Sequence, residues 1–143
     1  MKQRIKVLLS DGWADISQEN PSGPATFCRD ADDASGALQV SHAEYTAGVV
    51  PNPSLEDLIS LAASAARNEA GAALLHTAAG RCRFGLWGTA VHRTDECAHF
   101  QAWHLSNGRA VIFATYISED APSEAEVTQA HNIVMDLTLE GRP

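Results

Sequence analysis

The chain has 143 residues, 45% of them hydrophobic and 20% charged, which is the composition of one packed globular domain over residues 1–143. Ten Lys and Arg residues against eighteen Asp and Glu residues give a formal net charge of −8, which disfavours nucleic acid as a partner. The sequence has no apolar run of about 18 residues, so no membrane span is expected. Three cysteines without CxxC spacing argue against a disulfide framework and favour a reducing cytoplasm.

The N-terminal third predicts three short strands, in the segments "IKVLL", "PATFCRD" and "GALQVSHAEY". Turn-forming stretches separate them: "DGW", "NPSGP" and the acidic "DADDASG". The acidic stretch lacks the ligand spacing of a calcium loop and is interpreted as a solvated turn. The Pro-rich segment 47–54 is interpreted as an ordered surface loop that leads into a helix.

Two segments have helical periodicity and start signals. The first, residues 53–75, opens with Pro53-Ser54 and has Asp57 three positions after the serine. The second, residues 122–141, begins after Pro122 with a predicted capping box of Ser123 and Glu126. Each carries one apolar stripe. The stripe residues are Leu55, Leu58, Ile59, Ala62, Ala65 and Ala66 in the first helix, and Val127, Ala130, Ile133, Val134 and Leu137 in the second.

The stretch "FQAWHLSNGRAVIFATY" predicts a β-hairpin. Asn107-Gly108 suits a two-residue turn, so residues 98–106 and 109–118 should pair, with Ser106 facing Arg109. Residues 82–92 should add a third strand. With His92 assumed to face His99, one face carries Leu86, Ala90, Trp103, Leu105, Ile112 and Ala114, and the other carries Trp87, Val91, Phe100, Ala102, Val111 and Phe113. His104 is then expected to face Trp87.

Both faces of this predicted meander are mostly apolar, so both should be covered. The expected fold is α+β, with a mainly antiparallel sheet in the order β-β-β-α-β-β-β-α and helices on both faces. In this fold the hairpin is core, and loops carry any function.

The histidines offer one metal hypothesis. Under the assumed register, His92 and His99 lie across neighbouring strands and could share a metal ion. No third or fourth ligand has convincing spacing, so we expect no metal. No GxSxG, GxxxxGKS/T or GxGxxG motif is present, and no cysteine lies in a sequence that marks it as activated, so no catalytic residue and no cofactor are predicted.

The segments "DGWADIS", "SGPATFCRD", "GALQVS" and "PSLEDLISLAASAARN", followed by the meander ending in "RAVIFATYIS" and a C-terminal helix, resemble a known family. The order of elements is similar to that of the PsbP-like α/β/α sandwich, which includes photosystem accessory proteins, Ran-binding nuclear-transport factors and bacterial DcrB-like proteins. The resemblance covers most of the chain as a pattern without a diagnostic motif, so no functional residue carries over. It implies a non-catalytic protein that binds other proteins, as some bacterial members do as adaptors for secretion-system effectors.

The expected function is therefore a bacterial, cytoplasmic protein-binding module, either an adaptor or effector chaperone or an immunity protein. The acidic balance suits a basic toxin or a secreted effector as partner; no nucleic acid and no membrane are expected, and a monomer or a dimer is compatible with the sequence. The predicted partner-binding residues are Trp13, Tyr45, Val50, Pro51 and Pro53. Trp13 has an equally good alternative as a plug of the core. The alternative function is a small enzyme or metal-binding protein centred on His92 and His99.

Overall fold

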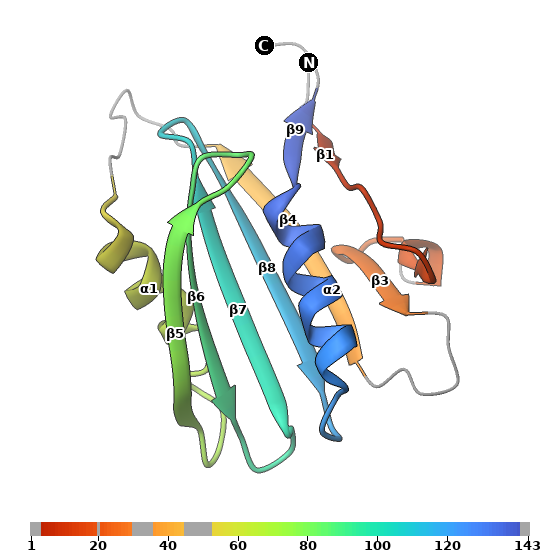
Figure 1. The fold of residues 1–143 in the computed structure, drawn as a ribbon, viewed down its shortest axis with the longest axis vertical. Coiled ribbons are helices and arrows are strands. Elements are labelled where there is room, and N and C mark those ends of the chain that lie inside the picture. Colours follow the sequence, from red (N-terminus) through yellow and green to blue (C-terminus); the bar gives the residue numbers. More distant parts are fainter. Residues whose placement is uncertain (1–3, 20, 30–35, 45–52, 141–143) are drawn as a thin grey trace.

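The computed structural model of the chain describes residues 4–19, 21–29, 36–44 and 53–140. Its main sheet is formed by the strands β2 (Trp13–Asp15), β3 (Ala25–Arg29), β4 (Gly36–Glu44), β5 (Ala73–Arg81), β6 (Leu86–Arg93), β7 (His99–Ser106) and β8 (Ala110–Ser118). All neighbours in this sheet are antiparallel, in the order β2-β3-β4-β8-β7-β6-β5 (Figure 1). The remaining elements are a 3₁₀ helix (Ser17–Glu19), the helices α1 (Leu55–Ser64) and α2 (Glu124–Met135), and a two-stranded sheet of β1 (Arg4–Lys6) and β9 (Thr138–Glu140).

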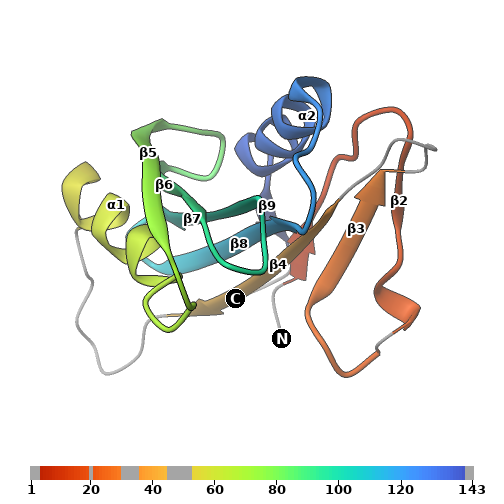
Figure 2. The same ribbon diagram turned by 90° about the horizontal axis from the view of Figure 1, so that it is seen from below.

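The predicted α+β class, with helices on both faces of an antiparallel sheet, is confirmed. Alanines of α1 pack against Ala90 and Ala102 on one face, whereas α2 packs against Trp103 and Leu105 on the other (Figure 2). The order of elements differs from the prediction. Four strands rather than three precede α1, four lie between the helices, and β9 follows α2. None of the described helices is long and apolar enough to span a membrane.

The predicted hairpin forms from β7 and β8, but its register is two residues away from the expected one. Ser106 pairs with Val111, and the amide of Asn107 donates to the carbonyl of Ala110 at 3.3 Å. The Asn107 Oδ1 atom accepts hydrogen bonds from the amides of Arg109 and Ala110, each at 2.8 Å, so Asn107 precedes the turn instead of occupying it. Gly108, with φ +87°, takes the first turn position. A shift of two residues keeps every side chain on its predicted face.

The register between β6 and β7 is wrong in the prediction by one residue, which reverses the faces of β6. His92 pairs with Phe100, not with His99. Trp87 and Val91 therefore share the α2 face with Trp103, while Leu86 and Ala90 lie on the α1 face. Size explains this arrangement, because the small β6 residues Gly88 and Ala90 allow α1 to approach closely while the large Trp87 packs under α2.

Helix α1 begins as predicted. Ser54 caps it, with the Asp57 amide donating to Ser54 Oγ at 3.1 Å and the Ser54 amide donating to Asp57 Oδ2 at 2.9 Å. It ends at Ser64, however, about ten residues before the predicted end. Turns follow, and Gly71 adopts φ +70°, which breaks the helical pattern. Residues 73–75, predicted as the end of this helix, are the start of the strand β5.

Helix α2 begins at its predicted cap but ends earlier than expected. Ser123 Oγ accepts the Glu126 amide at 3.1 Å, while the Glu126 side chain points into the core instead of closing a capping box. The helix ends at Met135, and the following residues form β9, which pairs antiparallel with β1. The two end segments of the described chain therefore meet.

The hairpin is buried core, as predicted. Trp103 has no exposed surface, and its indole Nε1 donates to His131 Nδ1 of α2 at 3.2 Å. The edge of His131 also contacts Trp87, with ring centroids 5.1 Å apart. His104 does not face Trp87. It lies on the α1 face against Phe113, with ring centroids 4.8 Å apart.

Candidate functional site

Three chain segments meet where β7 begins and α2 begins, at the lower end of the ribbon in Figure 1. The turn between β6 and β7 is closed by the Thr94 amide, which donates to the carbonyl of Cys97 at 3.0 Å. The Ala98 amide donates to the carbonyl of Glu119 at 3.0 Å, which ties this turn to the connection between β8 and α2. Backbone hydrogen bonds therefore hold residues distant in sequence in one surface region.

This region contains a hollow of about 610 Å³. The residues that line it come from the start of β7, the β8–α2 connection and the first two turns of α2: Ala98, His99, Ala121, Pro122, Glu124, Val127 and Thr128. The lining combines apolar side chains with a histidine, a carboxylate and a hydroxyl group. We call this hollow and its surrounding carboxylates the acidic hollow.

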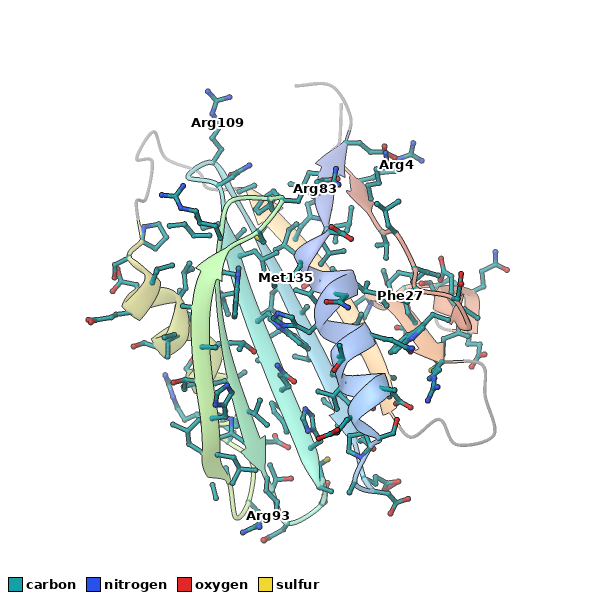
Figure 3. The ribbon with its side chains drawn as sticks, in the orientation of Figure 1. Arg4, Phe27, Arg83, Arg93, Arg109 and Met135 are labelled. Carbon is teal, nitrogen blue, oxygen red and sulfur yellow. The ribbon has the colours of Figure 1, made fainter. Side chains whose placement is uncertain are left out.

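Four exposed carboxylates lie on the segments that surround or line the hollow. They are Glu96, Glu119, Asp120 and Glu124. One arginine, Arg93, is exposed nearby at the end of β6 (Figure 3). The local excess of negative charge gives the region a potential that attracts cationic groups of a partner.

His99 is held in one orientation by a chain of hydrogen bonds across two strands. Thr89 Oγ1 donates to the carbonyl of Ala102 at 2.7 Å and accepts from Gln101 Nε2 at 3.1 Å. The remaining oxygen of Gln101 lies 2.9 Å from His99 Nε2. Because the Ala102 carbonyl and the Gln101 Oε1 atom only accept hydrogen bonds, His99 Nε2 must carry the proton. Neutral His99 therefore presents Nδ1 as a hydrogen-bond acceptor.

A buried carboxylate anchors the first turns of α2 beside the hollow. Glu126 has no exposed surface, and it accepts hydrogen bonds from the Tyr116 hydroxyl and, at 3.0 Å, from the Gly36 amide. Arg29 Nη1 lies 4.0 Å from its other oxygen. Burial and the hydrogen bond to Glu126 raise the pKa of Tyr116, so its phenol remains a donor at physiological pH. The His99 ring packs edge-on against this same tyrosine, with centroids 5.4 Å apart.

The sequence predicts Glu126 only as a capping residue. Its position contained a further signal, because it lies four residues before Ala130 on the apolar stripe of α2. A carboxylate on a buried stripe needs partners inside the core. The sequence could not identify those partners, because they come from β3, β4 and β8.

The structure locates two of the five predicted partner-binding residues. Trp13 is buried, and its Nε1 donates to Gln129 Oε1 of α2 at 2.8 Å. It therefore packs in the core, which is the alternative stated for it above. Pro53 is half-buried and lines a separate hollow of about 310 Å³ with Arg81 and the β7–β8 turn. Tyr45, Val50 and Pro51 lie outside the described residues, and their role stays a prediction.

The two histidines of the alternative hypothesis lie on opposite faces of the sheet. His92 is on the α1 face and buried, whereas His99 is on the α2 face. Burial lowers the pKa of His92. The assumption that these imidazoles face each other is wrong. Within residues 4–19, 21–29, 36–44 and 53–140, no group of three His, Cys, Asp or Glu side chains is arranged to hold a metal ion.

Two of the three cysteines have environments that favour the neutral thiol. Burial raises the pKa of Cys28, and the negative charges of Glu19 and Glu126 raise it further. Burial also raises the pKa of Cys82. Because the thiolate is the nucleophilic form, these positions do not favour covalent catalysis.

Comparison with known proteins gives a likeness in fold. No protein-family model and no curated protein sequence matches the chain. The solution structure of cyanobacterial PsbP (CyanoP) from Synechocystis sp. PCC 6803 is similar, with a TM-score of 0.57 and 15% sequence identity over 97% of this chain and 92% of that one. A crystal structure of a protein from Bacteroides thetaiotaomicron VPI-5482 matches with a TM-score of 0.48 and 13% identity, over 97% of this chain and 45% of that one. The predicted resemblance is thus confirmed at the level of architecture: the chain has a PsbP-like fold.

Proposed function

We propose that the chain is a non-catalytic protein-binding module that holds a basic partner protein at the acidic hollow. The observation that carries this proposal is a partly apolar hollow lined by Glu124, with the exposed carboxylates Glu96, Glu119 and Asp120 on the chain segments beside it. We propose an adaptor, effector chaperone or immunity protein as its biological type, with a basic toxin or secreted effector as partner.

The exposed carboxylates and the apolar lining contribute to binding in different ways. The exposed carboxylates at the rim would steer a basic partner and accelerate association, while contributing little affinity each. Pro122 and Val127 supply apolar surface inside the hollow, where a partner side chain would be removed from water. A Lys or Arg of the partner combines both features, because its aliphatic stem can pack inside while its charge reaches the rim.

His99 adds directional recognition to this surface. Its fixed Nδ1 acceptor suits an N–H or O–H donor of the partner. Charge-assisted bonds between guanidinium groups and carboxylates are stronger than neutral ones and geometrically specific. The site therefore favours a partner segment that contains arginine.

The proposal also includes a cytoplasmic location, which the three free cysteines support. The alternative of an enzyme or metal site at His92 and His99 receives no support, because their side chains lie on opposite faces.

The experiment compares two variants with the same change in net charge. The test variant replaces four carboxylates of the acidic hollow, as E96Q, E119Q, D120N and E124Q. The control replaces four exposed carboxylates elsewhere, as D11N, E19Q, E56Q and E140Q. Tagged proteins are used to isolate partners from cells of the source organism, and bound proteins are identified by mass spectrometry.

The expected result is a basic protein that binds the wild type and the control but not the test variant. Circular dichroism checks that both variants are folded. Equal loss with both variants would show that net charge alone attracts the partner, and equal retention would place the interface elsewhere. Either result would refute the proposed site.

A further inference from the structure

Strand β5 forms a long free edge of the main sheet. It extends over nine residues, whereas β2 at the opposite edge has three. Among the described strands, none pairs with the outer side of β5. Such an edge presents a row of backbone donors and acceptors to any strand that approaches it.

The side chains of β5 leave this edge open to pairing. Leu74 and Leu75 are 54% and 55% exposed, and a bulge lies between Leu74 and His76. The strand then continues in regular register to Arg81, with small residues at positions 78–80. Between Ala73 and Gly80 the strand has no charged residue other than the titratable His76. Natural proteins usually protect long edges with lysine, proline or short length, and β5 has only its bulge as protection.

The charge distribution favours a second copy of this chain as the occupant. Residues 67–96 contain four arginines and three acidic residues, a net charge of +1 in a chain with a formal net charge of −8. Two copies of an acidic protein repel each other least at this edge. A basic partner, in contrast, is attracted to the acidic remainder of the surface.

The two ends of β5 also differ in charge in a way that favours an antiparallel pair over a parallel one. Arg81 lies at the C-terminal end. Glu69 and Asp95 lie near the N-terminal end, where the Asp95 amide donates to the carbonyl of Ala70 at 2.9 Å, and Arg67 and Arg93 balance their two negative charges. A two-fold arrangement places Arg81 of each copy beside this balanced set of charges in the other, whereas a parallel arrangement would bring the two Arg81 side chains together.

We propose that β5 pairs antiparallel with β5 of a second copy about a two-fold axis, so that one sheet continues through both molecules. The pair covers the exposed leucines and fills the free backbone edge. Its location differs from the acidic hollow, so a dimer presents two such hollows and the two proposals stand independently.

The test is the mass of the purified protein in the absence of any partner, measured by sedimentation equilibrium. Protein concentrations from about 1 to 100 µM are used, because an interface with few large side chains is expected to associate weakly. The wild type should approach twice the monomer mass of 15.3 kDa. The L74K/L75K variant should remain monomeric, because it places four like charges at the shared edge. The matched control L8K/L61K replaces two leucines that are 47% and 45% exposed elsewhere, and it should dimerise like the wild type.

Hydrogen exchange gives a second readout that does not depend on a mutation. Backbone amides of β5 should exchange more slowly at high protein concentration than at low concentration, with no such change in β2. A monomeric wild type at 100 µM would overturn the proposal. A dimer that persists in L74K/L75K, without concentration-dependent protection of β5, would overturn it equally.

Discussion

The hydroxyl group of Tyr116 on β8 donates a hydrogen bond to the carboxylate of Glu126, the third residue of α2, and both side chains are buried. Glu126 also accepts the amide of Gly36 at the start of β4. One carboxylate therefore joins α2 to two central strands. It fixes the helix turns whose outer side lines the acidic hollow.

Removing one partner of this buried bond should destabilise the fold. We expect Tyr116→Phe to lower the free energy of unfolding by about 1–3 kcal/mol, because the carboxylate loses a donor inside the core. Glu126→Ala should lower it by about 3–5 kcal/mol, since the Gly36 amide also loses its acceptor and Arg29 loses a nearby negative charge. Urea unfolding of both single variants and the double variant measures the coupling. A coupling energy near zero would mean that the two groups do not interact.

Trp103 provides a second test of the core. We expect Trp103→Ala to lower the free energy of unfolding by about 3–5 kcal/mol, because the indole is fully buried beneath α2. Trp103→Phe should cost less, since it retains part of the ring volume. A Trp103→Ala protein with the wild-type urea midpoint would show that this hairpin is not core.

Local signals in the sequence predict those parts of the fold that depend on residues close to one another along the chain. The Ser54 and Ser123 caps and the hairpin at Asn107-Gly108 are such parts, and all three are present. For Ala73, Leu74 and Leu75 at the start of β5 the sequence predicts helix, because alanine and leucine favour helix when considered alone, and it predicts no element for the rest of this strand. The segment is a strand because it pairs with β6, a contact that no short window of sequence reveals.

Gly88 tests the close approach of α1 to the sheet. A β-carbon at this position would lie 2.6 Å from both the Ile59 amide nitrogen and the Leu58 carbonyl carbon. Backbone atoms of a packed helix cannot move aside cheaply, so Gly88→Ala should lower the free energy of unfolding by about 1–3 kcal/mol. The comparison is Gly80→Ala on β5, where the nearest atom is in the Trp87 ring at 3.2 Å and has more freedom to shift. Equal destabilisation by thermal melting in both variants would contradict this packing.

One buried histidine, His92, and two half-buried ones, His104 and His131, predict how stability depends on pH. Burial lowers the pKa of His131, as it does for His92 and His104, below the unfolded value of 6.5. Below pH 6.5 the unfolded chain binds more protons than the folded chain, so the free energy of unfolding should fall as the pH drops from 6.5 toward the lowered folded values. Above pH 6.5 this contribution is fully present.

His131→Gln should make that fall shallower. The glutamine oxygen can accept the hydrogen bond that Trp103 donates to His131 Nδ1, but the side chain does not titrate. His42→Gln, at an exposed position on β4, serves as the control and should leave the slope unchanged. The difference between the urea midpoints at pH 7.5 and pH 5.5 gives this slope for each protein. A His131→Gln protein with the full wild-type slope would refute the assignment.

The acidic hollow cannot be predicted from the sequence, for a physical reason. Its carboxylates are visible in the sequence, but Glu96 and Glu119 are brought near each other by the pairing of β7 with β8 and by the bond between the Ala98 amide and the Glu119 carbonyl. That contact depends on the register of β7 against β8. The sequence suggests His99 as half of a metal pair, and the one-residue error in the predicted β6 register places Thr89 on the opposite face from His99 and Gln101.

The central claim is that a basic partner binds at the acidic hollow, and chemical-shift mapping tests it most directly. The ¹⁵N-labelled protein is titrated with the purified partner, and backbone amide signals are followed residue by residue. We predict the largest shifts in residues 95–99 and 119–128, and a weaker response with E96Q/E119Q/D120N/E124Q. Shifts confined to residues 45–51 or to β5, with unchanged signals around the acidic hollow, would contradict the claim.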